Sequence, residues 1–197
     1  MISFVFKLVA KVYLLDIHQF LETQDHKHIV LINEDPAVGR DAEIQFIKSG
    51  LEKGQVCLYA TNNVALTKNH MESTGINVSQ FEQKAALQIC NVPKTFSEYR
   101  KVILEIVNDV KKYEKEIRLV STHDFDFSLN DNVNLMVEIE QKIDDVFSNI
   151  PGNMICSFSL SNMGKEQSKE FIERLLDSHH VVIFLQKDGT PKWFNLP

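Results

Sequence analysis

Cysteine, proline, glycine and tryptophan are all scarce in this sequence of 197 residues, which contains 3, 5, 7 and 1 of them respectively. So few cysteines, without a C-x-x-C pair, exclude a disulfide scaffold and provide no spacing typical of a zinc site. Cys57, Cys90 and Cys156 each fall in an apolar run that predicts a strand. We therefore expect buried, reduced thiols, as in a cytoplasmic protein.

Clusters of basic residues and long apolar runs are also missing. The 21 basic and 27 acidic residues give a net charge of −6, which argues against a nucleic-acid-binding surface because phosphate contacts need a basic face. Residues 1–15 are apolar, but Lys7 and Lys11 interrupt them, and the segment is too short to span a bilayer. Its apolar residues recur at helical spacing, so we expect an amphipathic helix that packs on the sheet, a partner subunit or a membrane surface.

The most informative stretch is residues 28–61, HIVLINEDPAVGRDAEIQFIKSGLEKGQVCLYAT. It contains an apolar run at 29–32, a turn with Pro36 and Gly39, a helical pattern at 41–52 and a second apolar run at 56–60. This order predicts a β-α-β unit. A helix that begins directly behind the turn would offer free N–H groups to an anion.

The rest of the chain repeats the alternation of strands and helices. Helices are predicted at 62–74, 98–115, 132–147 and 165–177, strands at 86–91, 117–122, 154–160, 181–185 and 191–196, and a polar connection at 76–84. This order predicts an α/β three-layer sandwich with a mainly parallel sheet. We expect an N-terminal amphipathic segment at 1–24 and a single domain at 25–197.

The turn after the first strand departs from a working phosphate loop, G-x-x-x-x-G-K-[ST]. Glu34 takes the place of the first glycine, Gly39 keeps the second, Arg40 replaces the lysine and Asp41 replaces the hydroxyl residue. With Asp35, three carboxylates lie where a triphosphate would be, and they would repel it. In a purely structural interpretation, Asp41 caps the helix and the turn is only a turn.

These residues carry a family resemblance. The block EDPAVGRDAEIQFIKSGLEKGQVCLYAT resembles the GxPGxGKT…QFL…GL..GE..LYVT pattern of RecA/KaiC-like ATPases. The chain more closely resembles the MEDS domain, a KaiC-related sensory domain without the nucleotide loop. His28, Gly75, Tyr99 and the segment LLDSHHVVIF also match, over roughly residues 25–187. The resemblance implies a RecA/KaiC-like fold and a role in bacterial or archaeal signal transduction.

The carboxyl ends of the strands are where ligands bind in open α/β sheets. Loops 33–41, 61–63 and 122–130 should therefore meet around a crevice. We expect the following residues to bind a ligand there: Glu34, Asp35, Gly39, Arg40, Asp41, His123, Asp124 and Asp126.

Several histidines could in principle belong to a metal site or to a catalytic site. The spacing of His18, His26 and His28, H-x7-H-x-H, matches no short helical metal-binding pair, so we expect no metal site. His179 follows a predicted helix end, where the helix dipole favours a protonated imidazole. No nucleophile triad is visible, and we expect neither catalytic residues nor a cofactor.

Three functions remain open. The first is a non-catalytic sensory or regulatory module that binds a small molecule or a protein partner. The second is an ATP-binding protein or weak ATPase in which Arg40 contacts phosphate. The third is an assembly subunit, a possible homo-oligomer, that uses residues 1–15 as an interface.

Overall fold

The computed structural model describes residues 17–123, 130–161 and 163–196. The amphipathic helix predicted in residues 1–15 lies outside this part of the chain, as do Asp124 and Asp126. The strands are β1 His28–Asn33, β2 Val56–Thr61, β3 Leu87–Asn91, β4 Ile117–His123, β5 Gly152–Ser159, β6 Val181–Leu185 and β7 Pro191–Asn195. The helices are α1 Ile17–Glu22, α2 Pro36–Glu52, α3 Val64–Ser73, α4 Val78–Gln83, α5 Phe96–Val110, α6 Asn130–Phe147 and α7 Lys165–Leu176.

The strands form one seven-stranded sheet in the order β3-β2-β4-β5-β1-β6-β7. All neighbours are parallel except β6 and β7, which pair antiparallel. β1 lies inside the sheet, between β5 and β6. All six of its residues are buried, which explains why its sequence is a continuous apolar run with little polar alternation.

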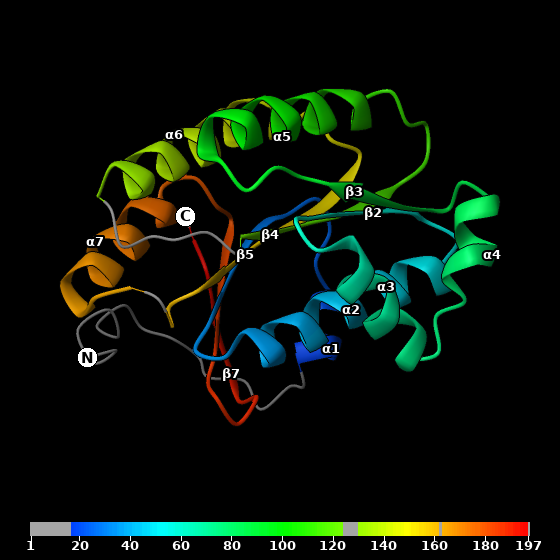
Figure 1. Cartoon of the computed structure of the whole chain (residues 1–197), viewed down its shortest axis with the longest axis horizontal. Coiled ribbons are helices and arrows are strands. Elements are labelled where there is room, and N and C mark those ends of the chain that lie inside the picture. Colours follow the sequence, from blue (N-terminus) through cyan, green and yellow to red (C-terminus); the bar gives the residue numbers. More distant parts are fainter. Residues whose placement is uncertain (1–16, 124–129, 162, 197) are drawn as a thin grey trace.

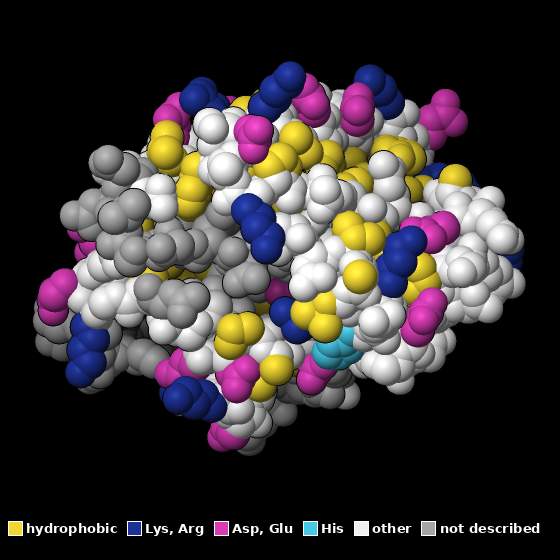
Figure 2. Space-filling model, viewed as in Figure 1, with side chains coloured by type: hydrophobic (Ala, Val, Ile, Leu, Met, Phe, Trp, Pro, Cys, Tyr) yellow, Lys and Arg dark blue, Asp and Glu magenta, His cyan; other side chains and the backbone are white. Residues whose placement is uncertain are grey.

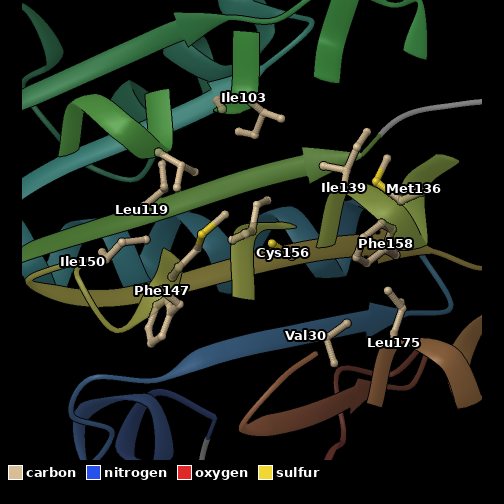
Figure 3. Packing of buried hydrophobic residues seen from close by; sticks show 14 of the residues in the cluster. Val30, Ile103, Leu119, Met136, Ile139, Phe147, Ile150, Cys156, Phe158 and Leu175 are labelled. Carbon is tan, nitrogen blue, oxygen red and sulfur yellow. The ribbon is translucent and has the colours of Figure 1, made fainter. Parts of the chain in front are cut away.

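Helices cover both faces of the sheet, as predicted. In Figure 1, α5 and α6 lie above the sheet and α7 lies at its left, while α1, α2 and α3 lie below it; Phe171 and Leu175 of α7 pack in the same core as α5 and α6. Each face has its own apolar core. Figure 3 shows the core under α5, α6 and α7, in which Cys156 of β5 lies between the rings of Phe147 and Phe158.

Two local predictions were wrong. Residues 76–84, expected to be a polar connection, contain the helix α4, which is capped by Asn77 through a bond from the Gln80 amide to Oδ1. The helix α2, predicted over residues 41–52, begins at Pro36 rather than at Asp41. By contrast, α3 ends close to Gly75, as predicted, and Gly75 has a φ of 86°, a conformation that favours glycine.

A charged network joins α1 to the sheet and to α2. Glu22 accepts hydrogen bonds from Ser49 and Lys53, and its Oε1 lies 3.2 Å from Nη1 of Arg118. Burial alone would raise the pKa of Glu22, but these partners lower it from 4.5 to about 2.

This network predicts a specific acid sensitivity. Because the folded-state pKa is depressed, the stabilisation is fully present above pH 4.5 and is lost as the pH falls towards 2. We expect the urea midpoint of the wild type to fall more between pH 5 and pH 3 than that of Glu22→Gln. Glu105→Gln, on the exposed face of α5, is the control for loss of one charge. Parallel pH profiles for the wild type and Glu22→Gln would contradict the prediction.

Candidate ligand-binding site at the carboxyl ends of the strands

The connection between β1 and α2 is only two residues long, Glu34 and Asp35. Asp35 is the N-cap of α2: its Oδ1 accepts a hydrogen bond from the Ala37 amide at 2.8 Å, and its carbonyl accepts one from the Gly39 amide at 3.1 Å. Pro36 at the first helical position also favours this start. The segment expected to be a turn is therefore wound into the helix.

This geometry explains what happens to the residues that align with a phosphate loop. Glu34 points towards β6 and the turn after it, since its amide donates to the carbonyl of Leu185 and its Oε2 accepts from the amide of Lys187. Asp41 is exposed and pairs with His70 at 2.7 Å, so it does not cap the helix. Gly39 is buried against Asn33, and a Cβ there would lie 2.4 Å from Asn33 Nδ2.

A pocket nevertheless lies at the carboxyl ends of the strands. Its volume is about 60 Å³, small beside the several hundred Å³ of a typical cofactor site. Of the predicted residues, Arg40 and His123 line it, whereas Glu34, Asp35, Gly39 and Asp41 do not. Its lining comes from the ends of four strands and the helices behind them: Asn33, Pro36, Arg40, Glu43, Thr61, Asn62, Asn63, Leu66, Thr67, Thr122, His123, Ser157 and Ser159.

A buried carboxyl forms part of the pocket wall. Glu43 of α2 is 4% exposed and accepts a hydrogen bond from the Tyr59 hydroxyl. Burial raises the pKa of Glu43, and its contacts with Ser157, Tyr59 and Arg40 offset this only in part. Asn33 Oδ1 is also buried and has no hydrogen-bond partner among the described residues. Glu43 was not predicted as a site residue, although it lies in the buried and otherwise apolar face of α2.

Comparisons with known proteins identify the family. The model of the MEDS domain, described as the methanogen/methylotroph, DcmR sensory domain, matches residues 27–179. The chain belongs to the MEDS family. A comparison with curated proteins finds no match.

The MEDS chain also resembles a solved structure, the KaiC-like protein of the hyperthermophilic archaeon Pyrococcus horikoshii OT3. The two share 16% sequence identity with a TM-score of 0.60, over 86% of this chain and 76% of the other. At this identity the likeness establishes the fold, so the predicted RecA/KaiC-like sandwich is confirmed. Within the described residues of the MEDS chain, no helix is both long and apolar enough to cross a membrane.

The floor of the pocket in this MEDS domain is His123, the last residue of β4. Its ring stacks on Phe158 with a centroid distance of 4.3 Å and an angle of 15°. Burial lowers the pKa of His123 to about 4, so the imidazole is neutral near pH 7. Its Nε2 lies 3.5 Å from Glu140 Oε1 of α6, which places a second polar group directly behind the pocket.

That second group consists of His28, Glu140, Cys156 and His179, all buried. The prediction for His179 was half right. Its Nδ1 bonds the carbonyl of Leu175 at the end of α7, at 2.7 Å, but burial lowers its pKa, so the expected protonated form is not favoured. Glu140 could have been noticed in the sequence, because it interrupts an apolar stripe of α6 that includes Met136 and Ile143.

Proposed function

We propose that this MEDS domain is a non-catalytic sensory or regulatory module, and that its strand-end pocket binds a small polar ligand. The observation that carries the proposal is the two-residue connection between β1 and α2. It removes the loop that would wrap a phosphate, while a polar pocket remains at the same end of the sheet. Family membership supports a sensory role.

The start of α2 argues against a nucleotide as the ligand. In phosphate-binding loops the first N–H groups of the helix face the anion. Here the Asp35 carboxylate accepts from one of these groups, the amide of Ala37. A negative charge at this point competes with an incoming phosphate for the helix dipole and repels it.

The pocket wall indicates what chemistry would fit. Arg40 is the single cationic side chain among the lining residues, and the remainder are mainly amides and hydroxyls. These groups suit a molecule of a few non-hydrogen atoms that is uncharged or carries one negative charge. Figure 2 shows dark-blue and magenta side chains interspersed over the face that it draws, without a broad field of one sign.

Calorimetric titration of the full chain tests the proposal. With glycolate and acetate as probes, we expect saturable binding with a Kd in the range of about 0.1–1 mM, since so few atoms limit the affinity. Loss of a charge-assisted hydrogen bond in Arg40→Gln should weaken it by about 10-fold or more. Arg100→Gln, which removes a partly exposed arginine of α5 that pairs with Glu138 of α6, should leave the affinity unchanged.

Titration with nucleotides distinguishes this proposal from the alternative, an ATP-binding protein or weak ATPase. With magnesium present, we expect no saturable binding of ATP or ADP up to millimolar concentration. Micromolar ATP binding that disappears in Arg40→Gln would replace the proposal with a variant ATP site. Failure of glycolate, acetate, formate and urea to bind the wild-type chain would contradict the small-ligand proposal itself.

A further inference from the structure

Four buried side chains from distant parts of the sequence converge between the sheet and α6. His28 begins β1, Cys156 lies within β5, His179 precedes β6 and Glu140 belongs to α6. One donor atom from each lies within 4.8 Å of every other. The core around them is apolar, as Figure 3 shows for the side chains flanking Cys156.

Three of the six distances between these donor atoms match the edges of a coordination shell better than hydrogen bonds, and the other three are no longer than 4.8 Å. His28 Nε2 is 3.4 Å from Cys156 Sγ and 3.5 Å from Glu140 Oε2, and His179 Nε2 is 3.4 Å from the same oxygen. The edges of a tetrahedron with metal–ligand bonds of about 2.0–2.3 Å measure roughly 3.3–3.8 Å. An N–H···O hydrogen bond is typically about 2.9 Å.

His28 Nε2 and Cys156 Sγ form a hydrogen-bonded pair, but the atoms of Glu140 and His179 in this group lack hydrogen bonds within the described residues. Both carboxylate oxygens of Glu140 and Nε2 of His179 are buried without a hydrogen-bond partner there. A buried carboxylate without such bonds costs several kcal/mol. A cation at the centre of the four residues would remove that penalty.

A hydrogen bond on its outer nitrogen orients the imidazole of His179 towards the centre. The carbonyl of Leu175 can only accept a hydrogen bond, so Nδ1 of His179 carries the proton and Nε2 presents its lone pair to Glu140. On the outer side of His28, Asp144 Oδ1 lies 3.8 Å from Nδ1. A carbonyl or carboxylate that accepts a hydrogen bond is the usual support of a metal-binding imidazole; Leu175 provides it for His179, whereas the Asp144 contact is too long for a hydrogen bond and His28 Nδ1 has no hydrogen-bond partner among the described residues.

We propose that His28, Glu140, Cys156 and His179 bind one Zn²⁺ ion. Two neutral imidazoles, a carboxylate and a thiolate give the site a net charge of zero, which suits a dry core. The Cys156 thiol releases its proton to solvent when the metal binds. Four protein ligands close the coordination sphere, so the ion stabilises the fold and does not activate water. The proposal is independent of whether the strand-end pocket binds a ligand.

Metal titration of the full chain, after treatment with a chelator, tests the site. We expect one Zn²⁺ per chain and, with Co²⁺ as the probe, the visible absorption of a four-coordinate ion together with a thiolate-to-cobalt charge-transfer band. Cys156→Ser should lose the charge-transfer band, and His179→Gln should weaken Zn²⁺ binding by ~100-fold or more. Cys57 is a buried cysteine of the opposite core, so Cys57→Ser should keep both the charge-transfer band and the affinity for Zn²⁺.

If a variant fails to fold, measurements on the wild-type chain alone still test the zinc site. X-ray absorption of the zinc-loaded protein should show one sulfur and three nitrogen or oxygen neighbours. Absence of stoichiometric binding at micromolar Zn²⁺ would overturn the proposal and leave a buried imidazole–carboxylate group. Binding without a sulfur neighbour, or unchanged in both Cys156→Ser and His179→Gln, would overturn it equally.

Discussion

Replacing Arg118 with alanine is expected to destabilise the folded chain by about 3–5 kcal/mol, the usual effect of removing one partner from a buried charged network. Arg118 lies in β4 and is 2% exposed. Nη1 donates to the carbonyl of Phe46 at 2.8 Å, and Nε donates to Gln55 Oε1 at 2.7 Å. The guanidinium also lies 4.6 Å from the ring centroid of Phe46. The substitution removes the guanidinium from both acceptors and from Glu22, which keeps only Ser49 and Lys53 among these partners.

Urea unfolding followed by far-ultraviolet circular dichroism measures the effect. For a chain of this size each kcal/mol lowers Tm by about 2–4 °C, so a thermal scan should show a fall of roughly 6–20 °C. Arg118→Met keeps most of the apolar stem of the side chain and should lower the unfolding free energy by less than Arg118→Ala. Arg100→Ala removes an arginine whose ion pair is partly exposed to solvent, and should cost about 1 kcal/mol or less. A similar cost for Arg118→Ala and Arg100→Ala would show that the network contributes little.

Replacing Phe147 with alanine should cost about 3–5 kcal/mol, because it leaves a cavity in a packed core. Phe147 ends α6 and is 1% exposed. Its ring stacks on His28 at 5.3 Å and approaches His26 at 5.0 Å and His180 at 5.3 Å. It therefore closes the side of the buried cluster that contains His28.

The same unfolding measurement applies to this substitution. Phe147→Leu keeps most of the volume and should cost about 1.5 kcal/mol or less. Phe81→Ala, in the half-buried part of α4, controls for the loss of an aromatic ring from a less packed place. If Phe147→Ala cost no more than Phe81→Ala, the packing around the histidines would be looser than the contacts indicate.

The elements that were predicted best from the sequence are those with a clear pattern within their own residues. The β1-α2-β2 block was recognisable because each strand is a continuous apolar run and α2 carries a helical pattern between them. α4 was missed because a six-residue helix with one buried position, Val78, has too few turns to show a period. The start of α2 was misplaced because the segment was compared with a phosphate loop, while Pro36 and the Asp35 cap already favoured a helix.

The candidate sites were less accessible to sequence reasoning, because they depend on the order of the strands. The meeting of the strand ends follows from a parallel sheet, so Arg40 and His123 could be placed near each other. The buried cluster could not be inferred from spacing, since His28 and His179 lie at opposite ends of the matched region. Only the insertion of β1 between β5 and β6 brings them together.

The insertion of β1 between β5 and β6 also affects how the chain folds while it is being synthesised on the ribosome. The backbone of Lys27 bonds Asn153, 126 residues downstream, and His28 bonds His180, 152 residues downstream. At a synthesis rate of about 5–20 residues per second, β1 waits on the order of ten seconds for its neighbours. During that time its apolar run, HIVLIN, is an unpaired strand open to the wrong partners. We therefore expect nascent chains of this topology to need shielding of β1 until the last third of the sequence emerges.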